Sequence, residues 1–318
     1  MTYNYDKWNF INSNLEYMDR LKSLSVLIKV ADSGSFTRCA EDLKMGQPTV
    51  SKAIDSLEKE FGVKLFHRST RKLAITEEGR KILIEARKVV DSYDGLLSVS
   101  QLKLLPKGTV KVTCPSALGT LVIMPLLENF KQHYPEITVH LMTTDLHLDM
   151  YENDLDVAFR VGEIHDSSLV AKRIGEIRRI AVAGRQYLKH SPAPRSISDL
   201  SSHRCIAVSK TGGRTVWKGT TQNGHPFSFE VDAEIEVDNH LALRAAVDAG
   251  LGIGLAGSFV FLEDGVLQKN FVQVLEDFEF TPYPAYIVFK QSRSLPARTR
   301  VFVDHFYQLL CDQSWLFN

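Results

Sequence analysis

The stretch from Phe36 to Phe61 constrains the fold of this 318-residue chain more than any other part. Its second half carries one apolar stripe at the helical period, formed by Val50, Ile54, Leu57 and Phe61. Pro48 suits the first turn of such a helix, where the missing N–H would have no intrahelical partner. The sequence therefore predicts a helix that buries one face in a core.

The first half of the stretch predicts a shorter helix that begins after Ser35, a favourable N-cap. Its buried side consists of Phe36, Ala40 and Leu43. Two short helices joined by a tight turn form a helix-turn-helix, which places the start of its second helix in the DNA major groove. The opposite face of that helix carries short polar groups and cations, namely Thr49, Ser51, Lys52, Asp55, Ser56 and Lys59. A plain helical hairpin inside a larger core is the alternative.

Further elements flank this unit. We expect residues 1–17 to be an extension and Asp19 to cap a preceding helix, whose apolar face is Leu21, Leu24, Leu27, Ile28 and Ala31. After it, Val63 to Thr76 alternates like a β-hairpin. No acid occurs between residues 61 and 72, where the cations are Lys64, Arg68, Arg71 and Lys72. A basic hairpin beside a helix-turn-helix is a wing that reaches phosphates or a minor groove, and a solvated charge cluster is the alternative.

A long helix follows from residue 77 to Pro106. Two seven-residue series run through it, Ile82, Val89, Leu96 and Leu83, Val90, Leu97, Leu104. At about 1.5 Å per residue such a helix is roughly 40 Å long, and its stripe is wider than a three-helix domain covers. A second copy of the chain is the expected partner, and packing against the C-terminal part of the same chain is the alternative.

From Thr109 the pattern changes to alternating strands and helices, which predicts an α/β domain with a largely parallel sheet. A second set of elements begins near residue 177, and the segments 286–289 and 297–310 have no partner in it. Two lobes joined by two crossing strands would enclose a cleft at the carboxyl ends of the strands. The candidate cleft residues are Ser116, Leu118, Thr143, Thr144, Arg160, Gly162, Ser209 and Asn239.

Donors outnumber acids among these cleft residues, which favours a small organic anion such as a carboxylate as ligand. In particular, Ser116 and the following N–H groups would form an anion site at a helix start. The alternative is that all these residues are only caps and turns.

Composition restricts the class of protein. Residues 1–111 contain 19 Lys and Arg but only 14 Asp and Glu, whereas residues 112–318 contain 19 Lys and Arg and 24 Asp and Glu. The first third of the chain is therefore basic, which suits a polyanion as binding partner. The four cysteines are widely separated, so we expect buried free thiols rather than disulfides or a zinc site. No apolar run is long enough to span a bilayer, which predicts a cytoplasmic protein without a membrane partner.

Catalytic and metal-binding patterns are weak. Asp145-x-His147-x-Asp149 has possible ligand types, but we expect Asp145 to cap a surface helix instead. Gly250-x-Gly252-x-Gly254 lacks the spacing of a nucleotide loop. We therefore predict no catalytic residues, no metal and no cofactor. A small-molecule binding or catalytic α/β protein, whose N-terminal helices only dimerise it, stays open as the alternative.

The residues also match a known family. The N-terminal part, from Arg20 to Gly79, closely resembles the DNA-binding domain of LysR-type transcriptional regulators. The motifs that carry this are Ala31-x-x-Gly34-Ser35-Phe36, Ala40-x-x-Leu43, Gln47-Pro48-Thr49-Val50-Ser51, Ile54-x-x-Leu57-Glu58, Leu65-Phe66-x-Arg68 and Leu73-x-x-Thr76-x-x-Gly79. The remainder resembles the effector domain of that family. Its motifs include Tyr134-Pro135, Asp156 to Gly162, Asp166-Ser-Ser-Leu169, His203-Arg204-Cys205 and Ala249 to Ile253.

This resemblance implies an α/β protein with four parts. They are an extension (1–17), a winged helix-turn-helix (18–76), a dimerising linker helix (77–106) and a two-lobed effector domain (107–318). That domain resembles type 2 periplasmic binding proteins, with lobe I at 107–176 and 283–318 and lobe II at 177–282. The implied function is bacterial transcription regulation in response to an effector, by a homodimer that is commonly a homotetramer.

The implied partners are an operator in double-stranded DNA, the effector, a second copy of the chain and, as a further candidate, RNA polymerase. The implied DNA-binding residues are Ser35, Gln47, Pro48, Thr49, Ser51, Lys52, Asp55, Arg68, Arg71 and Lys72. This chain departs from the family at Lys52, where Arg is common, and near Ala256-Gly257, where a Pro is usual. The first change alters base reading, because Lys lacks the planar fork of Arg. The second alters the rim of the ligand pocket.

Overall fold

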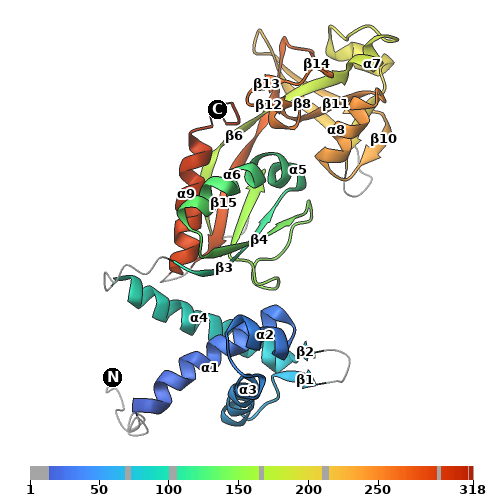
Figure 1. Ribbon diagram of the computed structural model, residues 1–318. Helices are drawn as coiled ribbons and strands as arrows, with labels where there is room; N and C mark the ends of the chain where they lie inside the picture. The colour runs from blue at the N-terminus through green and yellow to red at the C-terminus, as the bar shows by residue number, and fades with distance from the viewer. Residues whose placement is uncertain are drawn as a thin grey trace, which may run out of the picture. The chain divides into compact units, whose positions relative to one another are not determined.

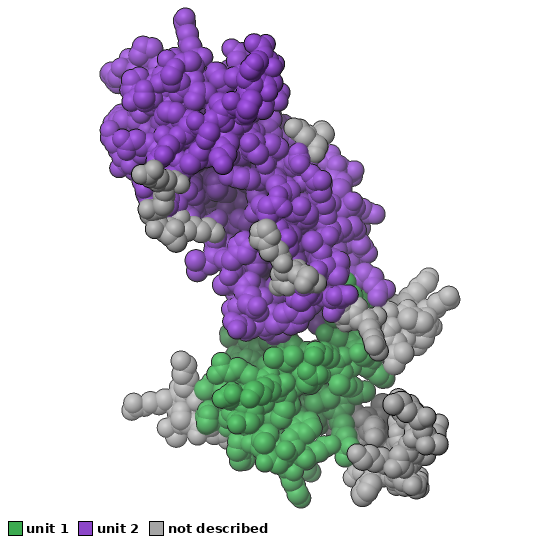
Figure 2. Space-filling model, turned by 180° about the vertical axis from the view of Figure 1, so that it is seen from behind, with its two compact units in different colours: residues 1–104, 294–297 green, residues 105–293, 298–318 purple. Residues whose placement is uncertain are grey.

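The computed structural model describes residues 14–68, 73–99, 106–164, 168–209, 215–291, 295–313 and 315–317. The chain divides into two compact units, residues 1–104 with 294–297 and residues 105–293 with 298–318 (Figure 2). Each unit has its own hydrophobic core. Among the described residues, none of the helices has both the length and the apolar character needed to cross a membrane.

The described part of unit 1 consists of four helices and a small hairpin (Figure 1). Its elements are α1 (Asn14–Ser33), α2 (Phe36–Asp42), α3 (Gln47–Phe61), β1 (Phe66–Arg68), β2 (Leu73–Ile75) and α4 (Glu77–Val99). The strands β1 and β2 pair antiparallel, with Phe66 opposite Ile75 and Arg68 opposite Leu73. The predicted helix-turn-helix and its hairpin are confirmed.

The core of unit 1 forms where the apolar stripes of α1, α2 and α3 meet. Val50, Ile54 and Leu57 are buried there, as their spacing predicts. Phe61 and Leu43 were predicted to be buried as well, but their exposed fractions are 41% and 36%. Both lie at helix ends, where the chain turns away from the core: Leu43 follows α2 directly and Gly62 ends α3 in the left-handed conformation.

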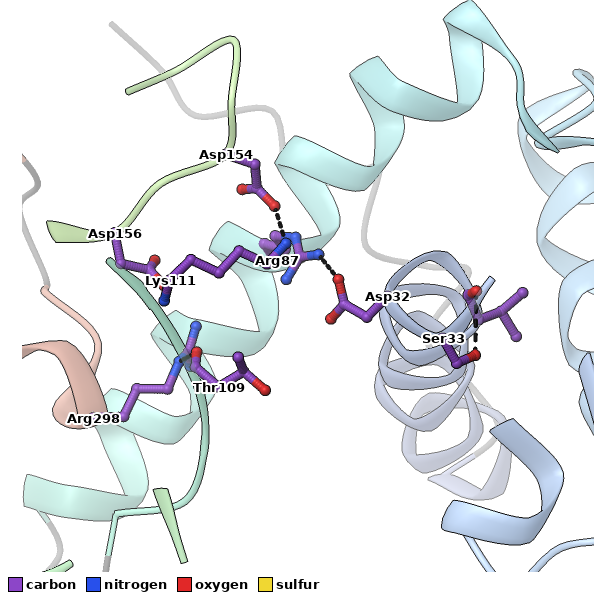
Figure 3. Close-up of polar contacts among 9 residues, drawn as sticks. Asp32, Ser33, Arg87, Thr109, Lys111, Asp154, Asp156 and Arg298 are labelled. Carbon is purple, nitrogen blue, oxygen red and sulfur yellow. Dashed lines mark hydrogen bonds and ion pairs between the residues drawn. The ribbon is translucent and has the colours of Figure 1, made fainter. Parts of the chain in front are cut away.

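The helix α1 begins at Asn14, so the prediction that Asp19 caps it is wrong. The preceding residues contain neither Gly nor Pro, and the helix therefore continues through them. Near its other end, α1 is joined to α4 by an ion pair in which Arg87 Nη2 lies 2.6 Å from Asp32 Oδ1 (Figure 3). The two side chains are 16% and 28% exposed, so this pair is better shielded from water than an ordinary surface pair.

The helix α4 keeps apolar side chains at its surface. Ile84, Val89 and Tyr93 are 42%, 48% and 40% exposed, and Val89 belongs to one of the two seven-residue series. The side chains of residues 94–99, and residues 100–105 altogether, lie outside the described part of the chain.

Unit 2 is a mixed α/β domain with one extended sheet (Figure 1). Its principal strands are β3 (Gly108–Cys114), β4 (Ile137–Thr143), β5 (Val157–Val161), β6 (Leu169–Gly184), β7 (Cys205–Val208), β8 (Thr215–Thr221), β9 (Pro226–Val231), β10 (Ala233–Val237), β11 (Ile253–Gly257), β14 (Phe271–Val274) and β15 (Phe278–Lys290). The short strands β12 (Leu262–Glu263) and β13 (Val266–Leu267) pair separately. The helices are α5 (Ser116–Leu118), α6 (Met124–His133), α7 (Arg185–Leu188), α8 (His240–Asp248) and α9 (Ala297–Cys311). Short turns η2 (Gly119–Ile123), η3 (Ile197–Ser202) and η4 (Ser258–Val260) complete it.

The sheet order is β10-β7-β11-β6-β15-β5-β3-β4. We call the part with β3, β4, β5, α6 and α9 lobe I, and the part with β7, β10, β11 and α8 lobe II. Within lobe I the strands β4, β3 and β5 are parallel, and within lobe II β7 is parallel to β10 and β11. The long strands β6 and β15 pair antiparallel with each other, and their ends pair with strands of both lobes. They are the two predicted crossing strands, and β6 alone is 16 residues long.

The helices α6 and α9 pack together over lobe I through aromatic rings. Phe130 lies 5.1 Å from Phe302 and 5.8 Å from Phe306, measured between ring centroids. The helix α6 is preceded by the π-helical turn Gly119–Ile123, which joins it to α5. Gly119 is needed there, because a Cβ would lie 2.6 Å from the methyl carbon of Thr143 at the end of β4.

The cysteines are free thiols. Cys39, Cys114 and Cys205 are buried, as predicted, whereas Cys311 is exposed. Burial raises the pKa of Cys205 to about 11 and that of Cys114 well above its usual range. The buried thiols therefore stay protonated at neutral pH and behave as small apolar groups.

Candidate DNA interface and ligand cavity

The predicted DNA-facing side of α3 is open to solvent. Gln47, Pro48, Thr49, Lys52 and Asp55 are exposed, and Ser51 is half-buried. Gly46 precedes the helix and offers no side chain to cap its first N–H groups. Pro48 has no N–H, and the N–H groups of Thr49 and Val50 donate to the Gly46 carbonyl at 2.9 and 3.2 Å. The exposed polar side chains are therefore the groups at this helix start that can meet a phosphate or a base edge.

The other predicted DNA contacts lie around α3. Ser35 caps α2 by accepting a hydrogen bond from the N–H of Arg38 at 3.3 Å. The side chain of Arg68, and Arg71 and Lys72 entirely, lie outside the described residues. Their role in the wing stays a prediction.

A buried acid of α3, for which no role was predicted, holds the residues that lead into the first strand of the wing. The side chain of Glu58 is 4% exposed. Its Oε1 accepts a hydrogen bond from the N–H of Leu65 at 2.9 Å, and its Oε2 accepts one from Lys64 Nζ at 2.6 Å. The signal available in the sequence was an acid next to Leu57 of the apolar stripe, with a lysine six residues later.

The same wing residues are bound from the start of α4. The hydroxyl of Thr76 donates to the carbonyl of Lys64 at 2.6 Å and accepts from the N–H of Gly79 at 2.8 Å. Gly79 also packs so closely that a Cβ there would lie 2.3 Å from the carbonyl oxygen of Leu65. We call Glu58, Lys64, Leu65, Thr76 and Gly79 the wing anchor.

Electrostatics favour the ionised form of Glu58. Burial alone would raise its pKa, but hydrogen bonds from Lys64 and from the Leu65 and Phe66 N–H groups, with the charge of Lys64, lower it below its ordinary value. The carboxylate is therefore charged at neutral pH.

The ligand cavity lies in unit 2, whose surface is visibly hollowed (Figure 2). It has a volume of about 200 Å³. Its wall includes the start of α5, the ends of β4 and β5, the start of α8 and the turn η4, so both lobes contribute. Four predicted ligand-binding residues line it: Leu118, Thr144, Arg160 and Gly162.

Arg160 is the half-buried cation of this wall. Its Nη2 donates to the carbonyl of Leu148 at 2.7 Å. Burial lowers the pKa of Arg160, which nevertheless stays protonated at neutral pH because an arginine titrates so far above it. Among the described residues, no carboxylate forms an ion pair with it. Arg160 therefore keeps N–H donors for a ligand.

The other four predicted residues lie beside the cavity without lining it. Ser116 starts α5, and its N–H points to Asp145 Oδ2 at 3.3 Å. The methyl group of Thr143 packs near Gly119. The N–H of Ser209 donates to the carbonyl of Val237, and the side chain of Asn239 caps α8 by accepting from the Ala242 N–H at 2.8 Å.

The prediction that Asp145 caps a surface helix is wrong, because residues 144–149 form no helix. Asp145 instead lines the cavity and accepts from the start of α5. Asp149, the other acid of that motif, accepts from the N–H groups of Tyr151 and Glu152 at 2.7 Å each and so closes a turn. No group of three potential metal ligands occurs among the described residues.

Three further ionisable residues line the cavity and were missed in the sequence: His147, Asp238 and His240. Asp238 and His240 are the neighbours of Asn239, which was predicted as a site residue. They line the cavity because α8 begins at this point. His147 follows the end of β4. The apolar part of the wall includes Val161, Ile177, Phe259, Val260 and Tyr283.

Comparison with known proteins gives two family matches. Residues 21–80 match the model of the bacterial regulatory helix-turn-helix protein, lysR family, and residues 104–310 match that of the LysR substrate binding domain. Together the two models cover both units.

Named relatives agree with these matches. The HTH-type transcriptional regulator CrgA of Neisseria meningitidis is 28% identical over 89% of this chain and 94% of its own length. An HTH-type transcriptional regulator of Xanthomonas campestris is 30% identical over 89% of this chain and 83% of its own. The solved structure of CrgA superposes with a TM-score of 0.60 at 26% identity, over 91% of this chain and 98% of that one.

Proposed function

The chain belongs to the LysR family of bacterial regulatory helix-turn-helix proteins, and from that membership we propose how its two units act. It is a transcriptional regulator with a DNA-binding domain and an effector-binding domain. The proposals below concern the DNA contacts, the assembly and the kind of effector.

In the proposed DNA complex, α3 lies in the major groove and the wing contacts the backbone. The exposed polar start of α3 supports this arrangement, with Lys52 and Gln47 as candidate base-reading residues. Two copies of the chain pair through α4 and present two such helices to a two-fold operator. The exposed Val89 and Tyr93 support this pairing.

The proposed effector is a small organic acid that binds in the cavity with its carboxylate on Arg160. The observation that carries this proposal is the half-buried guanidinium, which lines the cavity and has no described carboxylate partner. An arginine can bind a carboxylate through two parallel hydrogen bonds. The cavity then acts as a binding site without catalysis. Contact with RNA polymerase and action in the cytoplasm, where the chromosome lies, belong to the same proposal.

The test begins with purified full-length protein and sheared DNA from the host. Selection of the bound fragments should give an operator. A gel-shift titration with small organic acids should then identify an acid that changes the affinity of the protein for this operator or its footprint on it. Arg160→Ala should bind the operator normally and lose that response, whereas Arg195→Ala, an exposed control outside the cavity wall, should keep it. Failure to enrich any fragment would refute the DNA assignment, and an unchanged response in Arg160→Ala would refute the cavity assignment.

A further inference from the structure

The cavity wall contains two carboxylates, Asp145 and Asp238, and one guanidinium, Arg160, besides the imidazoles of His147 and His240. A ligand that carried only a carboxylate would gain one guanidinium partner and would meet two carboxylates of its own sign. Like charges in a confined, partly buried site repel strongly.

The helix start beside the cavity is partly occupied by an acid of the protein. Its first N–H, that of Ser116, is directed at Asp145 Oδ2 at 3.3 Å. This donor is therefore already bound to a carboxylate of the chain. Arg160 is the guanidinium of the cavity wall that a ligand carboxylate can bind, and its one described hydrogen bond goes to a neutral carbonyl.

The second acid is well placed for a cationic group. Asp238 is exposed and lies just before α8, and its Oδ1 accepts from the Asn239 side-chain amide at 2.7 Å. That amide is neutral, so the hydrogen bond leaves the charge of the carboxylate uncompensated. Asp238 comes from lobe II and Arg160 from β5 of lobe I, so the two charges lie on different lobes.

We propose that the effector is a small zwitterion whose carboxylate binds Arg160 and whose ammonium group binds Asp238 and Asp145. This inference rests on the proposed function of the cavity and specifies its ligand. An apolar substituent would lie against Val161, Phe259 and Tyr283. The cavity of about 200 Å³ has room for a compound of amino-acid size. Because the ligand would contact Asp238 of lobe II together with Arg160 and Asp145 of lobe I, the zwitterion would hold the lobes together.

Matched compounds that differ by one charged group test the proposal. L-leucine, isocaproate and isoamylamine form one series, and L-phenylalanine, hydrocinnamate and phenethylamine form another. Isothermal titration and thermal shift on the full-length protein should show that at least one amino acid binds. It should bind at least about tenfold more tightly than its deaminated acid, and the amines should not bind. Equal or tighter binding of the acid would overturn the zwitterion and leave the organic-acid function standing. Absence of binding by both amino acids at millimolar concentration would also overturn it.

Isosteric variants locate the charges. Asp238→Asn and Asp145→Asn should each reduce the preference for the amino acid over its acid, and the double variant should abolish it. Asp232→Asn, an exposed control outside the cavity wall, should retain the full preference. Arg160→Ala should weaken the binding of the amino acid and the binding of its deaminated acid to the same extent. A preference that survives in the double variant would show that the ammonium group is bound elsewhere and would refute the assignment.

Discussion

Replacing Glu58 by Gln should loosen the wing while leaving the helix-turn-helix folded. Glutamine has the same size as glutamate and keeps one carbonyl oxygen as acceptor. It has no charge, however, and its second polar group is an N–H₂ donor, which cannot accept a hydrogen bond from Lys64 or from a backbone N–H. Hydrogen bonds from backbone N–H groups to a charged partner contribute roughly 1.5–3 kcal/mol each. The contact with Lys64, a side chain that is 77% exposed, adds only about 0–1 kcal/mol. We therefore expect the variant to lose about 2 kcal/mol of unfolding free energy.

The loss should depend on pH in a defined direction. The folded-state pKa of Glu58 lies below its ordinary value, because the hydrogen bonds of the wing anchor outweigh burial. Its contribution to stability is therefore fully present above the unfolded pKa of about 4.3 and disappears as the pH falls through the lower, folded pKa. Wild type and Glu58→Gln should consequently differ at neutral pH and converge in acid, once the pH lies below the folded-state pKa of Glu58.

Hydrogen exchange on the full-length protein measures the local effect, because it reports the amides of Leu65 and Phe66 individually. Their exchange should accelerate in Glu58→Gln, and the affinity for the operator should fall. Glu60→Gln is the matched control, since Glu60 is 37% exposed and pairs only at the surface with Arg20 at 3.3 Å. Unchanged exchange of both amides, together with an unchanged unfolding midpoint, would refute the role given to Glu58.

Three further predictions concern DNA binding, assembly and packing. Lys52→Ala and Arg71→Ala should each weaken operator binding by about 1–3 kcal/mol without changing the thermal midpoint, and a gel-shift titration at fixed salt that shows no change for either would contradict this. Val89→Asp should convert the dimer to monomers in light scattering, since it places a charge on the exposed apolar side of α4; a dimer that persists at micromolar concentration would place the seam elsewhere. Gly79→Ala should destabilise unit 1 by roughly 1–3 kcal/mol, because the added methyl group would meet the Leu65 carbonyl. An unfolding midpoint in urea equal to that of the wild type would contradict this close contact.

Local periodicity was enough to predict most elements. Val50, Ile54 and Leu57 follow the helical period, and that period alone required one buried face. The exposed Phe61 shows the limit of the method, because a stripe does not reveal where the chain leaves the core. The same limit applies at the start of α1, where nothing in residues 14–18 opposes a helix and Asp19 was taken for its cap.

The polar wall of the cavity was harder to predict than the elements around it. Thr144 follows β4 directly and Arg160 is the next-to-last residue of β5, so both could be found from the strand ends. Asp145 was assigned to a helix because its residue type suits an N-cap. Its actual contact with Ser116 spans 29 residues and depends on the parallel register of β3 and β4, which aligns Cys114 with Thr143. Contacts of this kind are set by tertiary register, so a local pattern does not contain them.

The wing anchor also connects parts of unit 1 that a sequence reading treats separately. Glu58 belongs to α3, Leu65 precedes β1, and Thr76 and Gly79 belong to the junction of the hairpin with α4. Because Thr76 binds the Lys64 carbonyl and Gly79 packs on the Leu65 carbonyl, the first turn of α4 cannot rotate without displacing the residues that Glu58 holds. A change in the direction of α4 should therefore move the wing relative to α3. Glu58→Gln should weaken that coupling, since it loosens the one link of the anchor that comes from the recognition helix itself.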